Sequence, residues 1–112
     1  MNYFVIPGII RPDRMRKEYG FKKPNDIVAV VLNHFNITYD ELIIRSRKTN
    51  VVYRRQVLSY LLYRHTKISC VKIAAILGMD RTTIINSVRH LKAMIATEIE
   101  IRDEVETLQD SI

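Results

Sequence analysis

Residues 69–92 read SCVKIAAILGMDRTTIINSVRHLK, and this stretch decides the fold. It predicts one short helix over residues 70–77 and a second helix that starts at Arg81. Gly78 supplies the backbone freedom that a very tight turn between the two helices requires. Helices that cross at a steep angle also need small side chains where they approach each other. The small residues available there are Ala74 and Ala75.

Each of the two helices has an apolar side and a polar side. The apolar residues recur at helical spacing, which indicates that the two helices share a core. These residues are Ile73, Leu77, Ile84 and Val88. Asp80 is typical of a residue that caps the start of a helix, so the second helix begins directly after it. The pattern predicts a helix-turn-helix.

Positive charge is concentrated in one segment of the chain. The 112 residues have a net charge of +6, but residues 45–92 contain eleven Lys or Arg and a single acid, Asp80, a net charge of +10. From Glu98 onward the sign reverses, with six acids against Arg102. Because so much like charge costs folding free energy through self-repulsion, the segment indicates a polyanionic partner rather than simple solubility.

Ahead of the helix-turn-helix, the periodicity predicts three more helices. Asn25 is placed to cap a helix that ends near Phe35. Thr38 and Glu41 have the spacing of a capping box, which opens a short second helix. Asn50 is placed to cap a third and longer helix, whose outward face is expected to carry Arg54, Arg55 and Arg64.

The predicted fold is therefore all-α, a compact domain of about five helices. The predicted divisions are an N-terminal arm of unassigned structure at 1–24, the helix-turn-helix domain at 25–97 and an acidic helical tail at 98–112. The last helix is expected to continue into the tail as one long helix. Its apolar seam fits either a short coiled coil in a homodimer or packing on the domain's own core. The seam consists of Ile101, Val105, Leu108 and Ile112.

The composition excludes several classes of protein. A single cysteine, Cys70, cannot form an internal disulfide, and its apolar surroundings suggest a buried small hydrophobe. No stretch approaches the roughly 20 apolar residues of a membrane span, and the start lacks the charges of a secretion signal. The histidines have no cysteine or carboxylate at ligand spacing. We expect a cytoplasmic, nucleoid-associated protein with no metal, cofactor, membrane or small-molecule substrate.

The polar side chains of the helix-turn-helix are suited to double-stranded DNA. Arginine can bond guanine O6 and N7, asparagine can bond adenine, and threonine can contact a thymine methyl group or a phosphate. The candidate DNA-binding residues of the two helices are Ser69, Lys72, Asp80, Arg81, Thr82, Thr83, Asn86 and Arg89. No aromatic platform points to RNA, and no nucleophile–base pair or paired carboxylates point to an enzyme.

Four blocks of sequence carry a resemblance that covers about residues 26 to 95. They read VLNHFNITYDEL at 31–42, RSRK at 45–48, RQV at 55–57 and DRTTI at 80–84. In this order they resemble the C-terminal DNA-binding domain of the bacterial chromosomal replication initiator DnaA. That family reads Arg-Gln-Ile at the third block and Asp-His-Thr-Thr-Val at the fourth.

The resemblance implies where DNA contacts lie. The fourth block opens the family's recognition helix and touches bases in the major groove. The family's basic loop, just before the long third helix, reaches the minor groove and phosphates. This implies the same role for Arg45, Arg47, Lys48 and Arg54.

The sequence departs from the family at three places. The turn Gly78-Met79-Asp80 is one residue shorter than the family's Gly-Gly-Arg-Asp. Arg81 replaces the usual histidine, and Tyr53 replaces the family's minor-groove arginine. These changes bear on the recognised sequence, so the initiator's usual site is not assumed.

We expect a sequence-specific regulator of replication or transcription, of bacterial or phage origin, and not an enzyme. The initiator's ATPase module would precede this domain, but residues 1–25 contain no glycine-rich phosphate loop. The expectation is a stand-alone protein that binds DNA and recruits, blocks or bends. The alternative is a protein-interaction module that keeps the fold and binds a partner through its tail or N-terminal arm.

Overall fold

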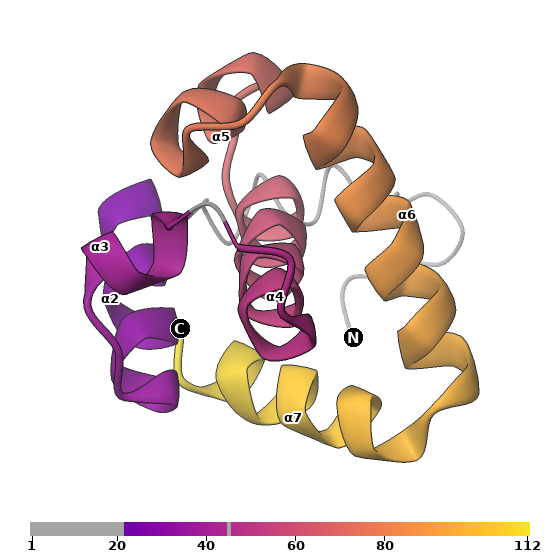
Figure 1. The fold of residues 1–112 in the computed structure, drawn as a ribbon. Helices are drawn as coiled ribbons and strands as arrows, with labels where there is room; N and C mark the ends of the chain where they lie inside the picture. The colour runs from indigo at the N-terminus through magenta and orange to yellow at the C-terminus, as the bar shows by residue number, and fades with distance from the viewer. Residues whose placement is uncertain (1–21, 45) are drawn as a thin grey trace, which may run out of the picture.

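The computed structural model describes residues 22–44 and 46–112, so residues 1–21 of the arm expected at 1–24 and the candidate contact Arg45 lie outside the described residues. The described residues form helices without strands, which confirms the all-α prediction. The helices are α2 (Pro24–Phe35), α3 (Tyr39–Ile43), α4 (Thr49–His65), α5 (Cys70–Leu77), α6 (Arg81–Thr97) and α7 (Ile99–Asp110) (Figure 1). None of them is long and apolar enough to cross a membrane.

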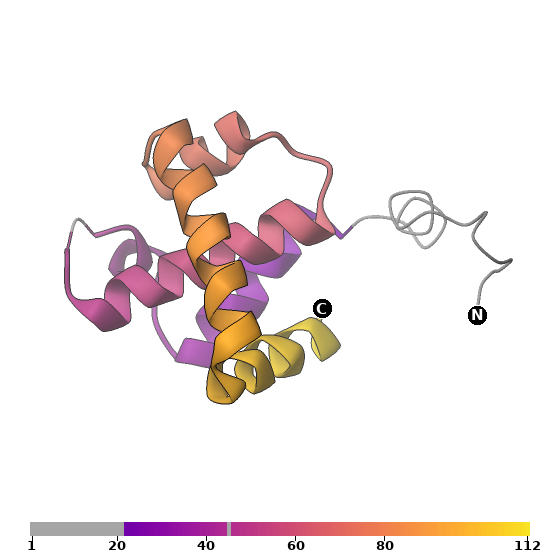
Figure 2. The same cartoon turned by 90° about the vertical axis from the view of Figure 1, so that its right-hand side faces the viewer.

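Helix α4 forms the centre of the fold. Helices α2, α3, α5 and α6 pack directly on it, and α7 packs against α6 and α2 (Figure 1). Figure 2 shows α6 running across α4 and ending at the corner where α7 begins. The arrangement makes α4 a common support for α2, α3, α5 and α6.

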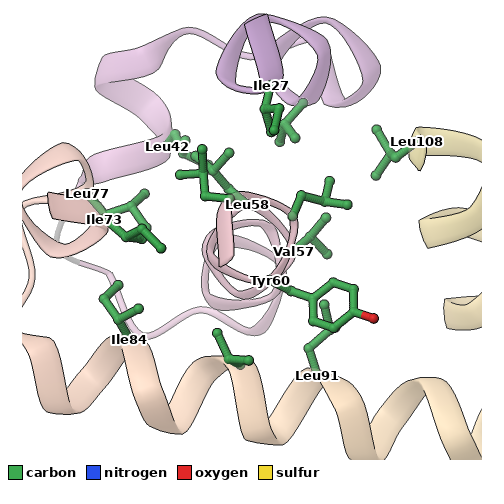
Figure 3. Close-up of a cluster of buried hydrophobic side chains, with 14 of the residues drawn as sticks. Ile27, Leu42, Val57, Leu58, Tyr60, Ile73, Leu77, Ile84, Leu91 and Leu108 are labelled. Carbon is green, nitrogen blue, oxygen red and sulfur yellow. The ribbon is translucent and has the colours of Figure 1, made fainter. Parts of the chain in front are cut away.

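The core is apolar and surrounds α4. Its fully buried residues on α4 are Val57, Leu58, Leu61 and Leu62. Side chains from the surrounding helices converge on them (Figure 3). These are Ile27 of α2, Leu42 of α3, Ile73 and Leu77 of α5, Ile84 and Leu91 of α6, and Leu108 of α7. Burial of this surface supplies the main driving force for folding.

Two of the predicted caps are wrong. Helix α2 begins at Pro24 after an extended Lys23, because the fixed φ of proline suits the first turn of a helix, and Asn25 lies inside it. Helix α4 begins at Thr49 after an extended Lys48. Asn50 therefore lies within the first turn, where its Oδ1 accepts a hydrogen bond from the amide of Val51 at 2.9 Å.

The capping box before α3 is confirmed. The Thr38 hydroxyl accepts a hydrogen bond from the Glu41 amide at 3.2 Å, and the Glu41 carboxylate accepts one from the Thr38 amide at 2.9 Å. These hydrogen bonds hold the pKa of Glu41 below its ordinary value. The two reciprocal bonds satisfy amides that would otherwise lack partners at the helix start.

The expectation of one long C-terminal helix is wrong. Helix α6 ends at Thr97, and the chain is extended at Glu98, with φ −122° and ψ 113°. Helix α7 then folds back, so that Val105 and Leu108 are only 2% and 1% exposed. Of the two alternatives for the tail seam, the structure has packing on the domain's own core. The seam is apolar, and its burial against α2 and α6 is favourable. This burial favours a separate helix that folds back over one continuous helix.

The side chain of Glu104 connects α7 to α4 and α2 by polar contacts. One carboxylate oxygen accepts a hydrogen bond from the Tyr53 hydroxyl of α4 at 2.5 Å, and the other lies 3.0 Å from Nε2 of His34 on α2. Burial, followed by the hydrogen bond and charge of Glu104, raises the pKa of Tyr53. One acidic side chain thus connects three helices.

Candidate nucleic-acid interface

The first helix of the helix-turn-helix is capped at both ends. The Ser69 hydroxyl accepts a hydrogen bond from the amide of Lys72 at 3.3 Å, which makes it the N-cap of α5. Gly78 ends the helix in the left-handed conformation, with φ 66° and ψ 34°. The amide of Met79 then donates back to the carbonyl of Ala74 at 2.9 Å. This closure reverses the chain within three residues and sets the entry of α6.

Asp80 caps α6, as predicted. Its carboxylate accepts a hydrogen bond from the amide of Thr83 at 2.7 Å. That hydrogen bond holds the pKa of Asp80 below its ordinary value, so the side chain is ionised at neutral pH. A negative charge is also favourable next to the positive end of the helix dipole.

The predicted core between α5 and α6 is confirmed. Ile73, Leu77, Ile84 and Val88 are all buried. One of the two alanines, Ala74, is buried at 5% exposure. The prediction for Ala75 is wrong: it is exposed, because each residue of an α-helix is rotated by about 100° from the one before it.

The outward face of α6 carries the predicted recognition residues. Arg81, Thr82, Asn86 and Arg89 are exposed, and Thr83 is half-buried. Thr82, Asn86 and Arg89 follow one another at spacings of four and three, so they form one strip along the helix. Neither arginine forms an ion pair with another described residue, and both are therefore available to an anionic or polar ligand.

A surface groove joins the recognition helix to the segment that precedes α4. Its upper part is lined by Ser46, Arg47, Arg55, Gly78, Met79, Asp80 and Thr83, among others. It continues beside α6 past Gln56, Asn86 and His90. We call this surface the α4–α6 groove. The structure thereby brings Arg47 of the basic loop together with Asp80, Thr83 and Asn86 of the recognition helix.

Other predicted residues lie outside the groove. The guanidinium of Arg54 lies 5.6 Å from the centre of the Phe35 ring, on the α2 side of α4. Ser69 and Lys72 are exposed at the start of α5, and Lys48 is exposed just before α4. None of these four residues belongs to the lining of the groove.

Arg55 is the residue for which the sequence prediction fails most clearly. It was expected on the surface but is only 8% exposed. Its Nη1 donates to the carbonyl of Ile44 at 2.6 Å, and its Nη2 donates to the carbonyl of Ser46 at 2.7 Å. Burial lowers the pKa of its guanidinium. The chain between α3 and α4 is folded over this side chain, and the helical pattern alone does not show that.

Several other residues of the groove lining were also absent from the predicted site. Among them are Ser46, Gln56, Met79 and His90. His90 follows Asn86 by four positions, so helical spacing could have placed it on the same strip. Gln56 stands in a matched block of the family resemblance. Ser46 and Met79 lie in turns, where no periodicity indicates which way a side chain faces.

Tyr53 holds the position of the family's minor-groove arginine but is engaged elsewhere. Its hydroxyl donates a hydrogen bond to Glu104 of α7, and the ring stands edge-on to Phe35, with 6.2 Å between the ring centres.

Among residues 22–44 and 46–112, no three His, Cys, Asp or Glu side chains are grouped as metal ligands would be. The α4–α6 groove carries polar and basic side chains, which are suited to hydrogen bonds and to the charge of phosphates.

Comparison with known proteins identifies similar sequences. Residues 24–91 match the family described as the bacterial dnaA protein helix-turn-helix. The chain is 34% identical over 105 residues to the chromosomal replication initiator protein DnaA of Nitrobacter hamburgensis. The aligned residues cover 93% of this chain and 21% of that protein.

Two further relatives have the same description. The DnaA protein of Bradyrhizobium sp. (strain ORS 278) is 32% identical over 105 residues, again covering 93% of this chain and 21% of the relative. The DnaA protein of Corynebacterium jeikeium is 32% identical over 90 residues, or 80% of this chain and 15% of the relative. The chain thus spans about a fifth or less of the length of these relatives. The match over residues 24–91 includes the whole α4–α6 groove.

Proposed function

The chain belongs to the bacterial DnaA helix-turn-helix family, and from this premise we propose that it binds double-stranded DNA in a sequence-specific manner. One observation carries the proposal: Arg47 shares a groove with Asp80, Thr83 and Asn86. A duplex whose major groove received the first turns of α6 would pass its backbone or adjacent minor groove over the segment before α4.

The residues then divide between two tasks. Phosphate and minor-groove contacts, which set affinity and position, are assigned to the predicted basic residues outside α6 and to the N-cap of α5. These are Arg45, Arg47, Lys48, Arg54, Ser69 and Lys72. Base readout is assigned to the strip on α6 and its N-cap, namely Asp80, Arg81, Thr82, Thr83, Asn86 and Arg89. Among the described residues, Arg47, Lys48, Arg54 and Lys72 form no ion pair, and this supports their assignment to phosphates.

We favour control of replication over transcription, because the similar proteins are named as replication initiators. The proposed activity of this domain is DNA binding, which can recruit, block or bend. We also propose that one copy occupies one site. The apolar seam of α7 supports this, since Val105 and Leu108 are already covered within the chain.

The test is a selection of bound sequences from a random duplex pool. We expect enrichment of one short sequence, whose affinity falls steeply between about 50 and 200 mM salt as counterions are displaced from phosphates. A site resembling the initiator's would support a role in replication. A palindromic site would contradict binding by single copies and indicate a homodimer.

A charge-matched control separates the groove from net charge. Arg47→Ala and Arg64→Ala remove the same charge, but Arg64 lies at the far end of α4 with its guanidinium 5.9 Å from the centre of the Tyr60 ring. We expect a loss of affinity for the selected site in the first variant and near-wild-type binding in the second. Equal binding of all duplexes would overturn the proposed sequence specificity. Failure to bind any duplex, together with a protein that co-purifies with the chain, would overturn the proposal and favour the protein-interaction alternative.

A further inference from the structure

Arg55 is a buried cation in the middle of the most basic part of the chain. Its side chain emerges from the second turn of α4 and is 8% exposed. Two of its nitrogens donate to backbone carbonyls, those of Ile44 and Ser46, at 2.6 and 2.7 Å. The third, Nε, is buried without a hydrogen-bond partner among the described residues.

No carboxylate in the described part of the chain balances this charge. The one ion pair found there joins His34 to Glu104, on the other side of α4. Accordingly, the pKa of Arg55 is lowered by burial, with no acidic neighbour that opposes the effect. A buried cation without a counter-charge is costly, and an apolar side chain of similar size would often stabilise the fold more. Stability alone therefore gives a poor account of an arginine here.

The surroundings of the guanidinium suggest another account. The two carbonyls that it binds lie directly before Arg47, so the hydrogen bonds fix the path by which the chain reaches that residue. The same side chain lines the α4–α6 groove opposite Thr83. Arg55 therefore touches both the segment that would meet the backbone of DNA and the space next to the recognition helix.

We propose that Arg55 is a positioning residue for DNA binding: it holds the segment before α4 so that Arg47 faces the recognition helix. Its own charge acquires a counter-charge when a phosphate of the duplex lies over the groove. The inference rests on the proposed function but assigns a role that neither the helical pattern nor surface exposure indicates. Preorganisation of this kind strengthens binding because the segment is ordered before DNA arrives.

The test uses substitutions that separate geometry from charge. Arg55→Lys keeps the charge, but one ammonium cannot reproduce the planar fork that spans two carbonyls. Arg55→Gln removes the charge as well. The matched control is Arg64→Gln, which removes an arginine whose guanidinium lies 5.9 Å from the centre of the Tyr60 ring at the far end of α4. With the duplex selected above, we expect both Arg55 variants to lose roughly tenfold or more in affinity, and Arg64→Gln to lose less than about threefold.

A double-mutant cycle gives the decisive readout. If Arg55 acts through Arg47, then Arg47→Ala weakens binding strongly in the wild-type background and only slightly in the Arg55→Lys background. Equal effects of Arg47→Ala in the two backgrounds would overturn the proposal, as would wild-type affinity in Arg55→Lys. Thermal unfolding identifies any variant that fails to fold, and Arg55→Lys then carries the test.

A second measurement does not depend on DNA. Amide hydrogen exchange should be faster at Lys48, whose amide donates to the Ser46 hydroxyl at 3.2 Å, in Arg55→Lys, with α6 unchanged, because the segment has lost its attachment to α4. Unchanged exchange at this amide would contradict the positioning role. Failure of the wild-type protein to bind any duplex would instead overturn the proposed function, and the exchange experiment would still report on Arg55.

Discussion

The hydroxyl of Tyr53 donates a 2.5 Å hydrogen bond to the carboxylate of Glu104, and this joins the centre of the fold to its last helix. The same α4 position is where the DnaA family carries an arginine for the minor groove. In this chain the position serves the attachment of α7, and the proposed function assigns contact with the minor groove to the neighbouring basic segment.

The first prediction concerns the stability that this hydrogen bond provides. Tyr53→Phe removes the hydroxyl but keeps the ring, so we expect the free energy of unfolding to fall by about 1–2 kcal/mol, typical of a partly exposed hydrogen bond to a charged group. The measurement is urea denaturation followed by circular dichroism. Tyr63→Phe is the control, because Tyr63 is 45% exposed and should tolerate the same change. Equal effects of the two substitutions would refute the assigned role of Tyr53.

The second prediction is a dependence on alkaline pH. The pKa of Tyr53 is raised above its ordinary value of 10.0, first by burial and then by Glu104. Above pH 10 the unfolded chain therefore loses the phenolic proton while the folded chain keeps it, and the free energy of unfolding falls as pH rises. Other groups titrate in this range, so the quantity to measure is the difference between wild type and Tyr53→Phe. We expect this difference to shrink above pH 10; a constant difference would contradict the shift.

Much of the fold follows from local signals in the sequence. The turn from Leu77 to Asp80 could be predicted because each residue there has a local reason to adopt its conformation. Gly78 takes a left-handed φ, and Asp80 bonds the amide three residues on. The capping box at Thr38 is equally local. These conformations are determined by neighbouring residues, so they can be predicted without knowledge of the tertiary contacts.

The wrong predictions concern features that depend on contacts between residues distant in the sequence. The break at Glu98 depends on the surface that α2 and α6 offer to Leu108, which no helical pattern reveals. Likewise, the helical position of Arg55 suggests exposure, but the two carbonyls ahead of α4 draw it inward. The candidate site was predicted residue by residue on α6, whereas the groove that joins it to Arg47 emerges only from the packing of α4 on α6.

The third prediction tests the turn of the helix-turn-helix. Gly78 has φ 66°, and a Cβ added there would meet nothing within 4 Å. Gly78→Ala should therefore cost only the conformational penalty of the left-handed region, about 1–2 kcal/mol of unfolding free energy. Gly78→Asn should cost less, since asparagine tolerates this conformation better. Denaturation curves of the two variants check the order, and an alanine variant at least as stable as the asparagine variant would argue against this account.

The fourth prediction tests whether α7 belongs to the core. Leu108 is 1% exposed, so Leu108→Ala should lower the free energy of unfolding by about 2–5 kcal/mol through lost burial and the resulting cavity. Ile99, 64% exposed at the start of the same helix, is the control, and Ile99→Ala should change stability by less than about 0.5 kcal/mol. The unfolding midpoint should not vary with protein concentration. A midpoint that rises with concentration would instead indicate that the seam of α7 is covered by a second copy.

The fifth prediction separates base readout from phosphate contact. Arg81 is exposed at the first position of the recognition helix, and Lys48 is exposed at the end of the basic segment. Arg81→Ala should cost about 1–3 kcal/mol of binding free energy and relax preference at one base position, because a side chain that bonds one base distinguishes it from the other three. The measurement is competition of the selected duplex against single-base variants.

Lys48→Ala provides the contrast within the same experiment. It should weaken binding to all duplexes by a similar factor and reduce the slope of log affinity against log salt by about one, because a phosphate contact is lost and one counterion fewer is released. If Arg81→Ala weakened every duplex equally and lowered the salt slope, then Arg81 would be a phosphate ligand. Base readout would then be assigned to Thr82, Thr83 and Asn86, which lie further along the helix, with Thr82 and Asn86 exposed and Thr83 half-buried.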